Sequence, residues 1–203
     1  MSFSSDFLKK STAVLAELDS TQIESAVMLL SDLKMREGRL FIVGSGGGAG
    51  HASHATSDFR KLCNIEAYAP YDNTPELTAR VNDNGWDTTL VDWLKVSRFN
   101  EKDCLLVFSV GGGDRQRNIS PNLVNALRLS ESTGASSIGI VGKNGGETVK
   151  LATVTILIPE IDEHLVTPIT EGVQAIVWHI LASHPVLQVR KAKWESEMNA
   201  CKE

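Results

Sequence analysis

Two segments of the chain carry side chains that could bind a metal ion or move protons. His54 and Asp58 are four residues apart in a segment with helical spacing, which places them on one helix face, one turn apart. An imidazole and a carboxylate in this position can share a metal ion or form an acid–base pair. A hydrogen bond on the helix surface is the plainer interpretation of this common spacing.

A second, more apolar segment carries Glu171, Gln174 and His179. His179 alone would fit a buried core histidine, but with Glu171, His54 and Asp58 it completes a set of two imidazoles and two carboxylates that suits Zn²⁺. Eight helical residues separate Glu171 from His179 by about 12 Å at 1.5 Å per residue, too far for one ion to contact both. Either Glu171 precedes the regular helix, or the two residues serve one site from different subunits.

Two glycine-rich stretches each follow an apolar run. Residues 44–50 (GSGGGAG) follow RLFIV, and residues 110–113 (VGGG) follow CLLVFS. A glycine turn between a strand and a helix N-terminus offers backbone N–H groups to a phosphate. Arg115 and Arg117, beyond the second stretch, are either phosphate contacts or solvated charges. A flexible turn without a ligand is the alternative for either stretch, and the presence of two favours phosphate binding.

The first glycine stretch also fits the loose form of a dinucleotide fingerprint. That motif requires an acidic residue at the end of the next strand. Glu66 lies inside or ahead of the apolar run IEAYAP rather than at its end, so a nicotinamide enzyme is not favoured. Residues 82–86 (NDNGW) indicate a turn. His51, His164 and His184 have no partner in the sequence and are interpreted as structural.

The elements that position these groups alternate along the chain. Apolar runs at 39–43, 104–109, 137–141 and 153–158 predict strands, and helices are expected at about 51–62, from Ser120-Pro121-Asn122 onward, and at 168–183. Leucines and other apolar residues three and four apart predict helices within the first forty residues. We expect Ser20 or Thr21 to cap the second of these helices, with Glu24 in its first turn. This alternation predicts an α/β fold with a parallel sheet covered by helices on both faces.

The composition narrows the class of protein. The chain has 203 residues, 42% of them hydrophobic, and a net charge of -5, which disfavours broad binding to nucleic acid. Cys63, Cys104 and Cys201 are widely spaced, so they indicate reduced cytosolic thiols rather than a disulfide framework. Since no run approaches the length of a spanning helix, we expect no membrane segment, and a cytoplasmic location.

The motifs together resemble a sugar-isomerase (SIS) domain, and within that class the phosphoheptose isomerases. The resemblance rests on GSGGGAGHASHATSDF, VNDNGW, LVFSVGGG with ISPNLVNAL, VGKNGG and TEGVQAIVWHIL, in this order. It implies a single SIS domain over 1–203, with a helical arm at about 1–37, an α/β core at 38–184 and a helical tail at 185–203. It also implies a homotetramer with active sites between subunits, which would resolve the separation of Glu171 and His179.

The resemblance also implies roles for individual residues. His54, Asp58, Glu171 and His179 match the metal ligands, predicted to hold Zn²⁺, with Asp58, Glu171 and His179 also catalytic. The substrate would be bound by Ser45, Gly46, Gly47, Asn82, Asp83, Ser109, Val110, Gly111 and Ser120. Four positions depart from the family's pattern. Ser45 replaces an Asn and Gly48 a Ser in the first loop, and Asp58 replaces a Glu and Glu171 a Gln. The second glycine stretch also replaces a serine-rich phosphate loop and is longer.

The implied function is an aldose–ketose isomerase that acts on sedoheptulose 7-phosphate through an enediol. Either Asp58 or Glu171 would be the base. Two alternatives remain open from the residues: an isomerase for another sugar phosphate, and a non-catalytic SIS module that binds a protein such as a replication initiator. A complete ligand set speaks against the module, because a binding protein does not need it.

Overall fold

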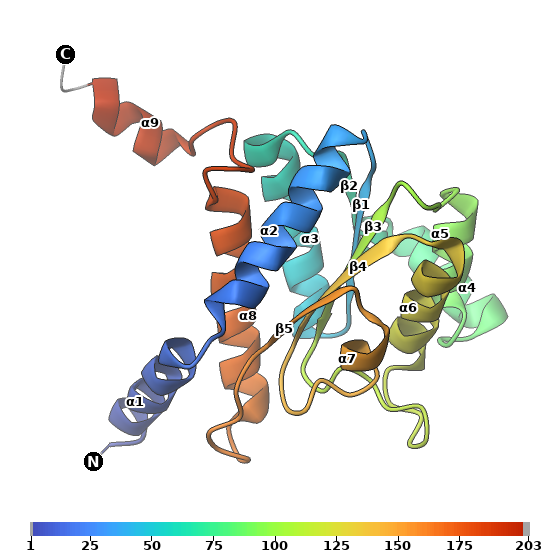
Figure 1. The fold of residues 1–203 in the computed structure, drawn as a ribbon. Helices are drawn as coiled ribbons and strands as arrows, with labels where there is room; N and C mark the ends of the chain where they lie inside the picture. Colours follow the sequence, from blue (N-terminus) through green and yellow to red (C-terminus); the bar gives the residue numbers. More distant parts are fainter. Residues whose placement is uncertain (1, 201–203) are drawn as a thin grey trace.

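A parallel sheet forms the centre of the molecule. The structure, a computed structural model, describes residues 2–200. Figure 1 shows three layers, with five strands in the middle and helices on both sides. The strands lie in the order β2-β1-β3-β4-β5. Their bounds are β1 Leu40–Gly44, β2 Ala67–Tyr68, β3 Cys104–Ser109, β4 Ser136–Val141 and β5 Val154–Leu157. The predicted α/β fold is confirmed.

The central strands are apolar along their length because both of their faces are covered. In β1, Leu40 and Ile42 belong to one core cluster, whereas Phe41 and Val43 belong to the other. Successive side chains of a strand point to opposite faces, so a strand buried on both sides needs an uninterrupted apolar run. This is why short apolar runs were sufficient to locate the strands.

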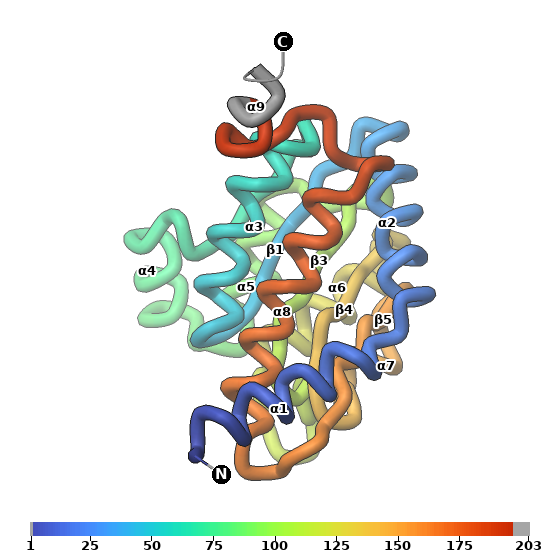
Figure 2. Tube along the Cα trace, turned by 90° about the vertical axis from the view of Figure 1, so that its left-hand side faces the viewer, coloured from blue at the N-terminus to red at the C-terminus, as the bar shows by residue number. Residues whose placement is uncertain are grey.

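The helices divide between the two faces of the sheet. Their bounds are α1 Phe3–Ala16, α2 Ser20–Met35, α3 Gly47–Cys63, α4 Thr74–Asn84, α5 Thr89–Val96, α6 Pro121–Thr133, α7 Thr148–Leu151, α8 Val166–Ser183 and α9 Lys193–Ala200, with a short 3-10 turn at Pro70–Asp72. Helices α2, α3 and α8 pack on one face, and α5 and α6 on the other. In Figure 2, α3 and α8 run side by side across the face that carries α2.

The strand order places both glycine loops at one point. From β1 the chain passes to β2 on one side, and then returns to β3 on the other side of β1. The carboxyl ends of β1 and β3 are in register, with Gly44 opposite Phe108. Ligands of open α/β sheets bind at such a change of direction. The two glycine loops therefore share the carboxyl edge of the sheet.

Two of the glycines in the first loop serve packing. A Cβ on Gly44 would lie 2.4 Å from the backbone carbonyl of Gly48, and a Cβ on Gly48 would lie 2.9 Å from the carbonyl oxygen of Phe108. The start of α3 therefore packs on β1 and β3 backbone to backbone. No side chain fits at Gly44 or Gly48 without moving the helix away from the sheet.

The helix boundaries correct several expectations. Helix α3 begins at Gly47 rather than near His51. The N-cap of α2 is Asp19, whose carboxylate accepts a hydrogen bond from the Thr21 backbone N–H, rather than Ser20 or Thr21. Glu24 lies beyond the first turn of that helix. The helix expected after Ser120 begins at Pro121, so that prediction is confirmed.

The segment between β2 and β3 differs most from the expectation. Asn82, Asp83 and Asn84 form the last turn of α4 rather than a free turn, and Gly85, with φ of 84°, ends the helix. Helix α5 follows directly. The start of α4 had a recognisable signal, since Asn73 accepts a hydrogen bond from the Glu76 N–H and a proline occupies the first turn.

The described cysteines are free thiols, Cys63 and Cys104, and both are buried. Burial raises the pKa of Cys63 to about 11 and that of Cys104 to about 12, so both stay protonated at neutral pH. Cys201 lies outside the described residues. Within the part of the chain described, no helix combines the length and apolar character needed to cross a membrane.

Candidate active site

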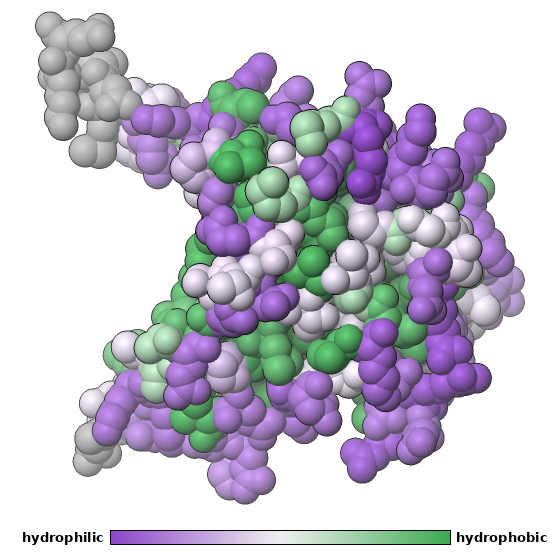
Figure 3. All heavy atoms as spheres, viewed as in Figure 1, coloured by the Kyte–Doolittle hydropathy of each residue, from purple (hydrophilic) through white to green (hydrophobic). Residues whose placement is uncertain are grey.

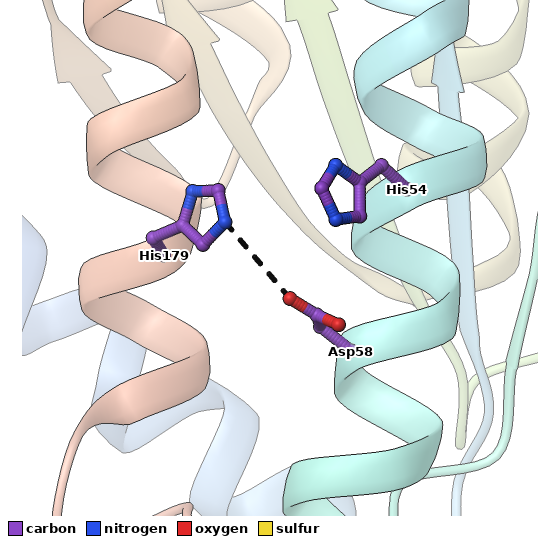
Figure 4. Close-up of side chains that lie close together, drawn as sticks. All are labelled: His54, Asp58 and His179. Atoms are coloured by element: carbon purple, nitrogen blue, oxygen red, sulfur yellow. Dashed lines mark ion pairs between the residues drawn. The ribbon is translucent and has the colours of Figure 1, made fainter. Parts of the chain in front are cut away.

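Three of the four expected metal ligands converge between α3 and α8. One ligand atom from each of His54, Asp58 and His179 lies within 4.8 Å of the other two. Figure 4 shows His54 and Asp58 on successive turns of α3, facing His179 on α8. The Nε2 atom of His179 lies 4.0 Å from Oδ2 of Asp58. Two imidazoles and one carboxylate form a donor set typical of zinc.

A hydrogen bond to the backbone fixes the proton of His179. Its Nδ1 lies 2.7 Å from the carbonyl oxygen of Ala175, one turn earlier in α8. A carbonyl oxygen only accepts, so Nδ1 carries the hydrogen, and the lone pair of the neutral ring is on Nε2. That nitrogen faces Asp58, as metal binding through Nε2 requires.

Glu171 lies at the first glycine loop instead of with the other three side chains. A Cβ on Gly47 would lie 2.5 Å from the Glu171 carboxyl carbon, so the carboxylate packs against the bare backbone of the loop. Helix α8 is continuous from Val166 to Ser183, which excludes the idea that Glu171 precedes the regular helix. Within one chain the structure therefore does not bring Glu171 to His179.

His51, which the sequence analysis interpreted as structural, lies near Glu171, His54 and His179. Its ring lies beside Phe108, at a centroid distance of 5.6 Å, and its Nε2 is buried with no hydrogen-bond partner among the described residues. Burial lowers the pKa of the His51 imidazole, which favours its neutral form, although the nearby Glu171 acts in the opposite direction. The spacing of three residues between His51 and His54 was the available signal.

The carboxyl end of β1 is held by a tyrosine. The Tyr71 hydroxyl accepts a hydrogen bond from the Gly44 N–H at 3.0 Å and donates to the Gly44 carbonyl oxygen. Burial raises the pKa of Tyr71 to about 12. After the two Tyr71–Gly44 hydrogen bonds, the chain reaches Gly46, which has a φ of 57°. The buried Ser45 hydroxyl oxygen has no partner in the described chain. Ser45, Gly46 and Gly47 therefore form a loop that starts from a fixed point.

The second glycine loop packs on the loop that follows β4. The Ser109 hydroxyl accepts from the Gly112 N–H at 3.0 Å, which curls the loop back on the end of β3. The Val110 and Gly112 carbonyl oxygens accept from the Gly142 and Thr148 N–H groups. Loop residues 109–112 are therefore held by the Ser109 hydroxyl and by backbone hydrogen bonds to the segment that follows β4.

Helix α8 is fastened to the same edge of the sheet. The buried Gln174 side chain donates from Nε2 to the Ser109 carbonyl oxygen at 3.1 Å and to the Ile140 carbonyl oxygen at 2.8 Å. These bonds tie α8 to the carboxyl ends of β3 and β4. They set the position of the helix that carries Glu171 and His179.

The extra residues between the second loop and α6 form a small hairpin. Asp114 and Ile119 are paired antiparallel, and the Asp114 carboxylate accepts from the backbone N–H groups of Gln116 and Arg117. Arg117, but not Arg115, lines a cavity of about 660 Å³ between this hairpin and the loop after β4. Ser120 caps α6 through its backbone only, in a left-handed conformation that leaves its hydroxyl out of the cap.

Asn82 and Asp83 lie on the exposed end of α4. The Asn82 amide donates to the Asp83 carboxylate at 2.8 Å. The described residues of α4 include no buried side chain. In the present chain these two residues are therefore displayed outward, and the structure does not join them to the group of His54, Asp58 and His179.

The remaining histidines have ordinary surroundings. His184 Nε2 lies 3.4 Å from a Glu24 carboxylate oxygen, and the exposed His164 lies 3.9 Å from Glu163. The structural interpretation of His164 and His184 stays a prediction.

Comparisons with known proteins identify relatives of this chain. No family model matches the chain. The phosphoheptose isomerase of Citrifermentans bemidjiense is 32% identical over 176 residues, which cover 84% of this chain and 85% of that protein. The phosphoheptose isomerase of Helicobacter pylori is 25% identical over 183 residues, 87% of this chain and 90% of that protein.

A further relative is the lincomycin biosynthesis protein LmbN of Streptomyces lincolnensis, 30% identical over 186 residues. This match covers 87% of the chain but 66% of LmbN.

Solved structures show the same fold. The phosphoheptose isomerase of Francisella tularensis superposes with a TM-score of 0.77 at 20% identity, over 90% of this chain and 97% of that one. The enzyme of Neisseria gonorrhoeae gives a TM-score of 0.76 at 20% identity, over 88% and 94% of the two chains. With the sequence relatives, these matches establish the assignment: the chain belongs to the phosphoheptose isomerase family of SIS-domain proteins.

Proposed function

We propose that this chain is an aldose–ketose isomerase that converts sedoheptulose 7-phosphate into D-glycero-D-manno-heptose 7-phosphate or a closely related heptose 7-phosphate. The observation that carries the proposal is the convergence of His54, Asp58 and His179 at the face between α3 and α8. Helix α3 begins at the first of the two glycine loops at the switch point of the sheet. Family membership supplies the substrate class.

The chain's residues divide the reaction between them. The base removes a proton from C1 of the ketose, and the proton returns at C2 after an enediol forms. Asp58 and Glu171 are the two candidates for that base. Asp58 stands next to His179, and Glu171 stands at the first glycine loop. His179 acts as a ligand or as a proton donor through Nε2.

We propose Zn²⁺ as the metal, with His54, Asp58 and His179 as ligands and Glu171 as the fourth. The imidazoles and carboxylate that converge here fit such an ion by their chemistry. When bound, zinc supplies a positive centre near the oxygen that gains charge.

Both glycine loops would hold the substrate. Ser45, Gly46 and Gly47 would contact the sugar, together with Asn82 and Asp83. The phosphate would be bound by Ser109, Val110, Gly111 and Ser120. The carboxyl-edge position of both loops supports this division, because binding energy from the distant phosphate orients the reacting carbons.

We further propose a homotetramer with active sites between subunits. Glu171 and His179 are two helical turns apart on one continuous helix, so one ion could take them from two chains. Apolar residues are exposed on two of the helices that cover one face of the sheet, among them Met28 on α2 and Ile176 and Ile180 on α8. Figure 3 shows apolar surface gathered over α2 and α8, on a hollowed side of the molecule. We propose the cytoplasm as its compartment, in line with the free thiols of Cys63 and Cys104.

Metal content and turnover, measured on one sample, test this function. The purified protein is assayed with sedoheptulose 7-phosphate before chelation, after chelation and after Zn²⁺ is added back. Turnover should disappear on chelation and return with zinc, while circular dichroism shows that the chelated protein stays folded. Turnover that survives complete removal of metal would reject the zinc-assisted reaction. A folded, zinc-loaded protein without turnover would reject the substrate.

A second candidate is the same reaction on a different sugar phosphate. The hairpin at Asp114–Ile119 and the cavity of about 660 Å³ beside it favour this candidate, because Arg117 and Lys143 both line that cavity. A panel of ketose and aldose phosphates of different chain lengths distinguishes the two. A higher kcat/KM for a substrate other than the heptose phosphates would favour the second candidate.

A further inference from the structure

Trp178 contacts both histidines of the candidate metal group. Its indole stacks on the His179 ring, with centroids 3.5 Å apart and an interplanar angle of 26°. The His54 ring meets the same indole edge-on, at 4.7 Å and 66°. The two imidazoles are themselves nearly perpendicular, at 88° and 5.6 Å. The indole therefore contacts two rings that are nearly perpendicular to each other.

The three rings differ in how firmly the protein holds them. Trp178 is 1% exposed and belongs to the main core cluster, whereas the His179 side chain is 50% exposed and His54 is also exposed. His179 is additionally tied by its hydrogen bond to Ala175. Among the described residues, the His54 side chain makes no hydrogen bond, and its ring contacts are with the Trp178 indole and the His179 imidazole. The indole is the buried member of these three rings.

We propose that Trp178 is a positioning residue for zinc binding, which fixes the ring planes of His54 and His179 before the ion arrives. The inference rests on the proposed metal site. Aromatic rings prefer stacked and edge-to-face contacts, so turning either imidazole about its Cβ–Cγ bond loses a favourable contact with the indole. A ligand that is already oriented loses less side-chain freedom when it binds. Trp178 thus acts on the metal through its ligands and touches neither metal nor substrate.

The test compares zinc affinities measured by competition with a chromophoric chelator. Trp178→Leu removes the flat face but keeps an apolar side chain, and it should weaken zinc binding by about 10- to 100-fold, as loss of groups that orient metal ligands does. Trp178→Phe restores an aromatic face and should recover most of the affinity. Trp93→Leu is the matched control, because Trp93 is also buried but lies in the core cluster on the other face of the sheet. The control should bind zinc as the unaltered protein does.

Each outcome decides the proposal. Unchanged zinc affinity in folded Trp178→Leu overturns it, and so does an equal loss in Trp93→Leu, since that would be a general effect of losing a buried indole. Failure of the unaltered protein to bind zinc rejects the metal site itself and this inference with it. If the unaltered protein binds zinc and Trp178→Leu binds it equally well, the role of Trp178 is rejected and the metal site stands.

A second measurement covers the case in which Trp178→Leu does not fold. A protein whose only tryptophan is Trp178 is made by Trp86→Phe, Trp93→Phe and Trp194→Phe. Because the indole contacts both ligand rings, Co²⁺ in place of zinc should quench its emission in proportion to occupancy, up to saturation. If Trp178 emission is unchanged when Co²⁺ fully occupies its site, the ion does not bind at the two imidazoles that Trp178 contacts, and the proposal is overturned.

Discussion

The two ends of the sheet differ in whether their buried polar groups are hydrogen-bonded within the chain. At the amino end, the buried Asp103 carboxylate accepts hydrogen bonds from the Arg39 backbone and guanidinium and from the Asn100 N–H. The other Arg39 donors reach the Ser97 and Arg98 carbonyl oxygens at 2.8 and 2.9 Å. At the carboxyl end, Ser45 Oγ, His51 Nε2 and Gln174 Oε1 are buried and have no hydrogen-bond partner among the described residues.

This difference separates stability from function. A buried polar atom without a partner destabilises the fold by about 1–3 kcal/mol, so native proteins satisfy such atoms where nothing else is required. At the amino end, the Asp103 carboxylate accepts its hydrogen bonds from Arg39 and Asn100 within the chain, and these bonds contribute to stability. The carboxyl end, where the proposed site lies, leaves these three polar atoms without partners in the described chain. Substitutions at the two ends should therefore fail in different assays.

The largest effect is expected at the site end, from His179→Ala. Turnover of sedoheptulose 7-phosphate should fall by about 10²- to 10⁴-fold, the usual contribution of a positioned acid–base group. Stability should change by no more than about 0.5 kcal/mol, because the side chain is half exposed. His164→Ala, in an exposed histidine outside the site, is the control and should keep full activity. Near-normal turnover in His179→Ala would reject the role given to this residue.

At the opposite end, Asp103→Ala should damage stability and spare chemistry. The change leaves the Arg39 guanidinium without its buried carboxylate and should lower the free energy of unfolding by about 3–5 kcal/mol in urea titrations. Arg80→Ala breaks the more exposed ion pair with Glu76 and should lower it by less than about 1 kcal/mol. Below the unfolding transition, kcat of the Asp103 variant should match that of the unaltered protein. If kcat of folded Asp103→Ala were selectively lower than that of the unaltered protein, the amino end would also contribute to catalysis, contrary to this prediction.

The smallest effect sharpens the comparison within the site end. Gly47→Ala places a Cβ at 2.5 Å from the flexible Glu171 carboxylate, which must shift while the backbone stays. We expect kcat to fall by about 10-fold, because displacements near 1 Å in a positioned group are costly, with little change in stability. Gly50→Ala in the same helix meets no atom within 4 Å and should keep its activity. Equal activities of the two variants would show that the position of Glu171 against the loop is unimportant.

Local sequence signals predicted much of the fold. Uninterrupted apolar runs located β1, β3, β4 and β5 to within about one residue. The signal is strongest for the central strands β1, β3 and β4, since both of their faces are buried. They did not locate α4 and α5, because α4 buries no side chain and its sequence lacks a strong apolar stripe. The cap of α2 was placed one or two residues late, since Asp19, Ser20 and Thr21 are all good caps and geometry chooses among them.

The candidate site divides along the same line. The sequence by itself determined that His54 and Asp58 share a helix face, because a spacing of four fixes this in any helix. It also determined that two glycine loops follow strands. Only the tertiary structure decided that the His179 side chain lies beside that pair, that Glu171 lies at Gly47 instead, and that the Trp178 indole contacts both imidazoles. The physical reason is that these contacts depend on how α8 packs on α3 and on the Gln174 bonds that fasten α8 to the sheet, and no spacing along one chain segment records them.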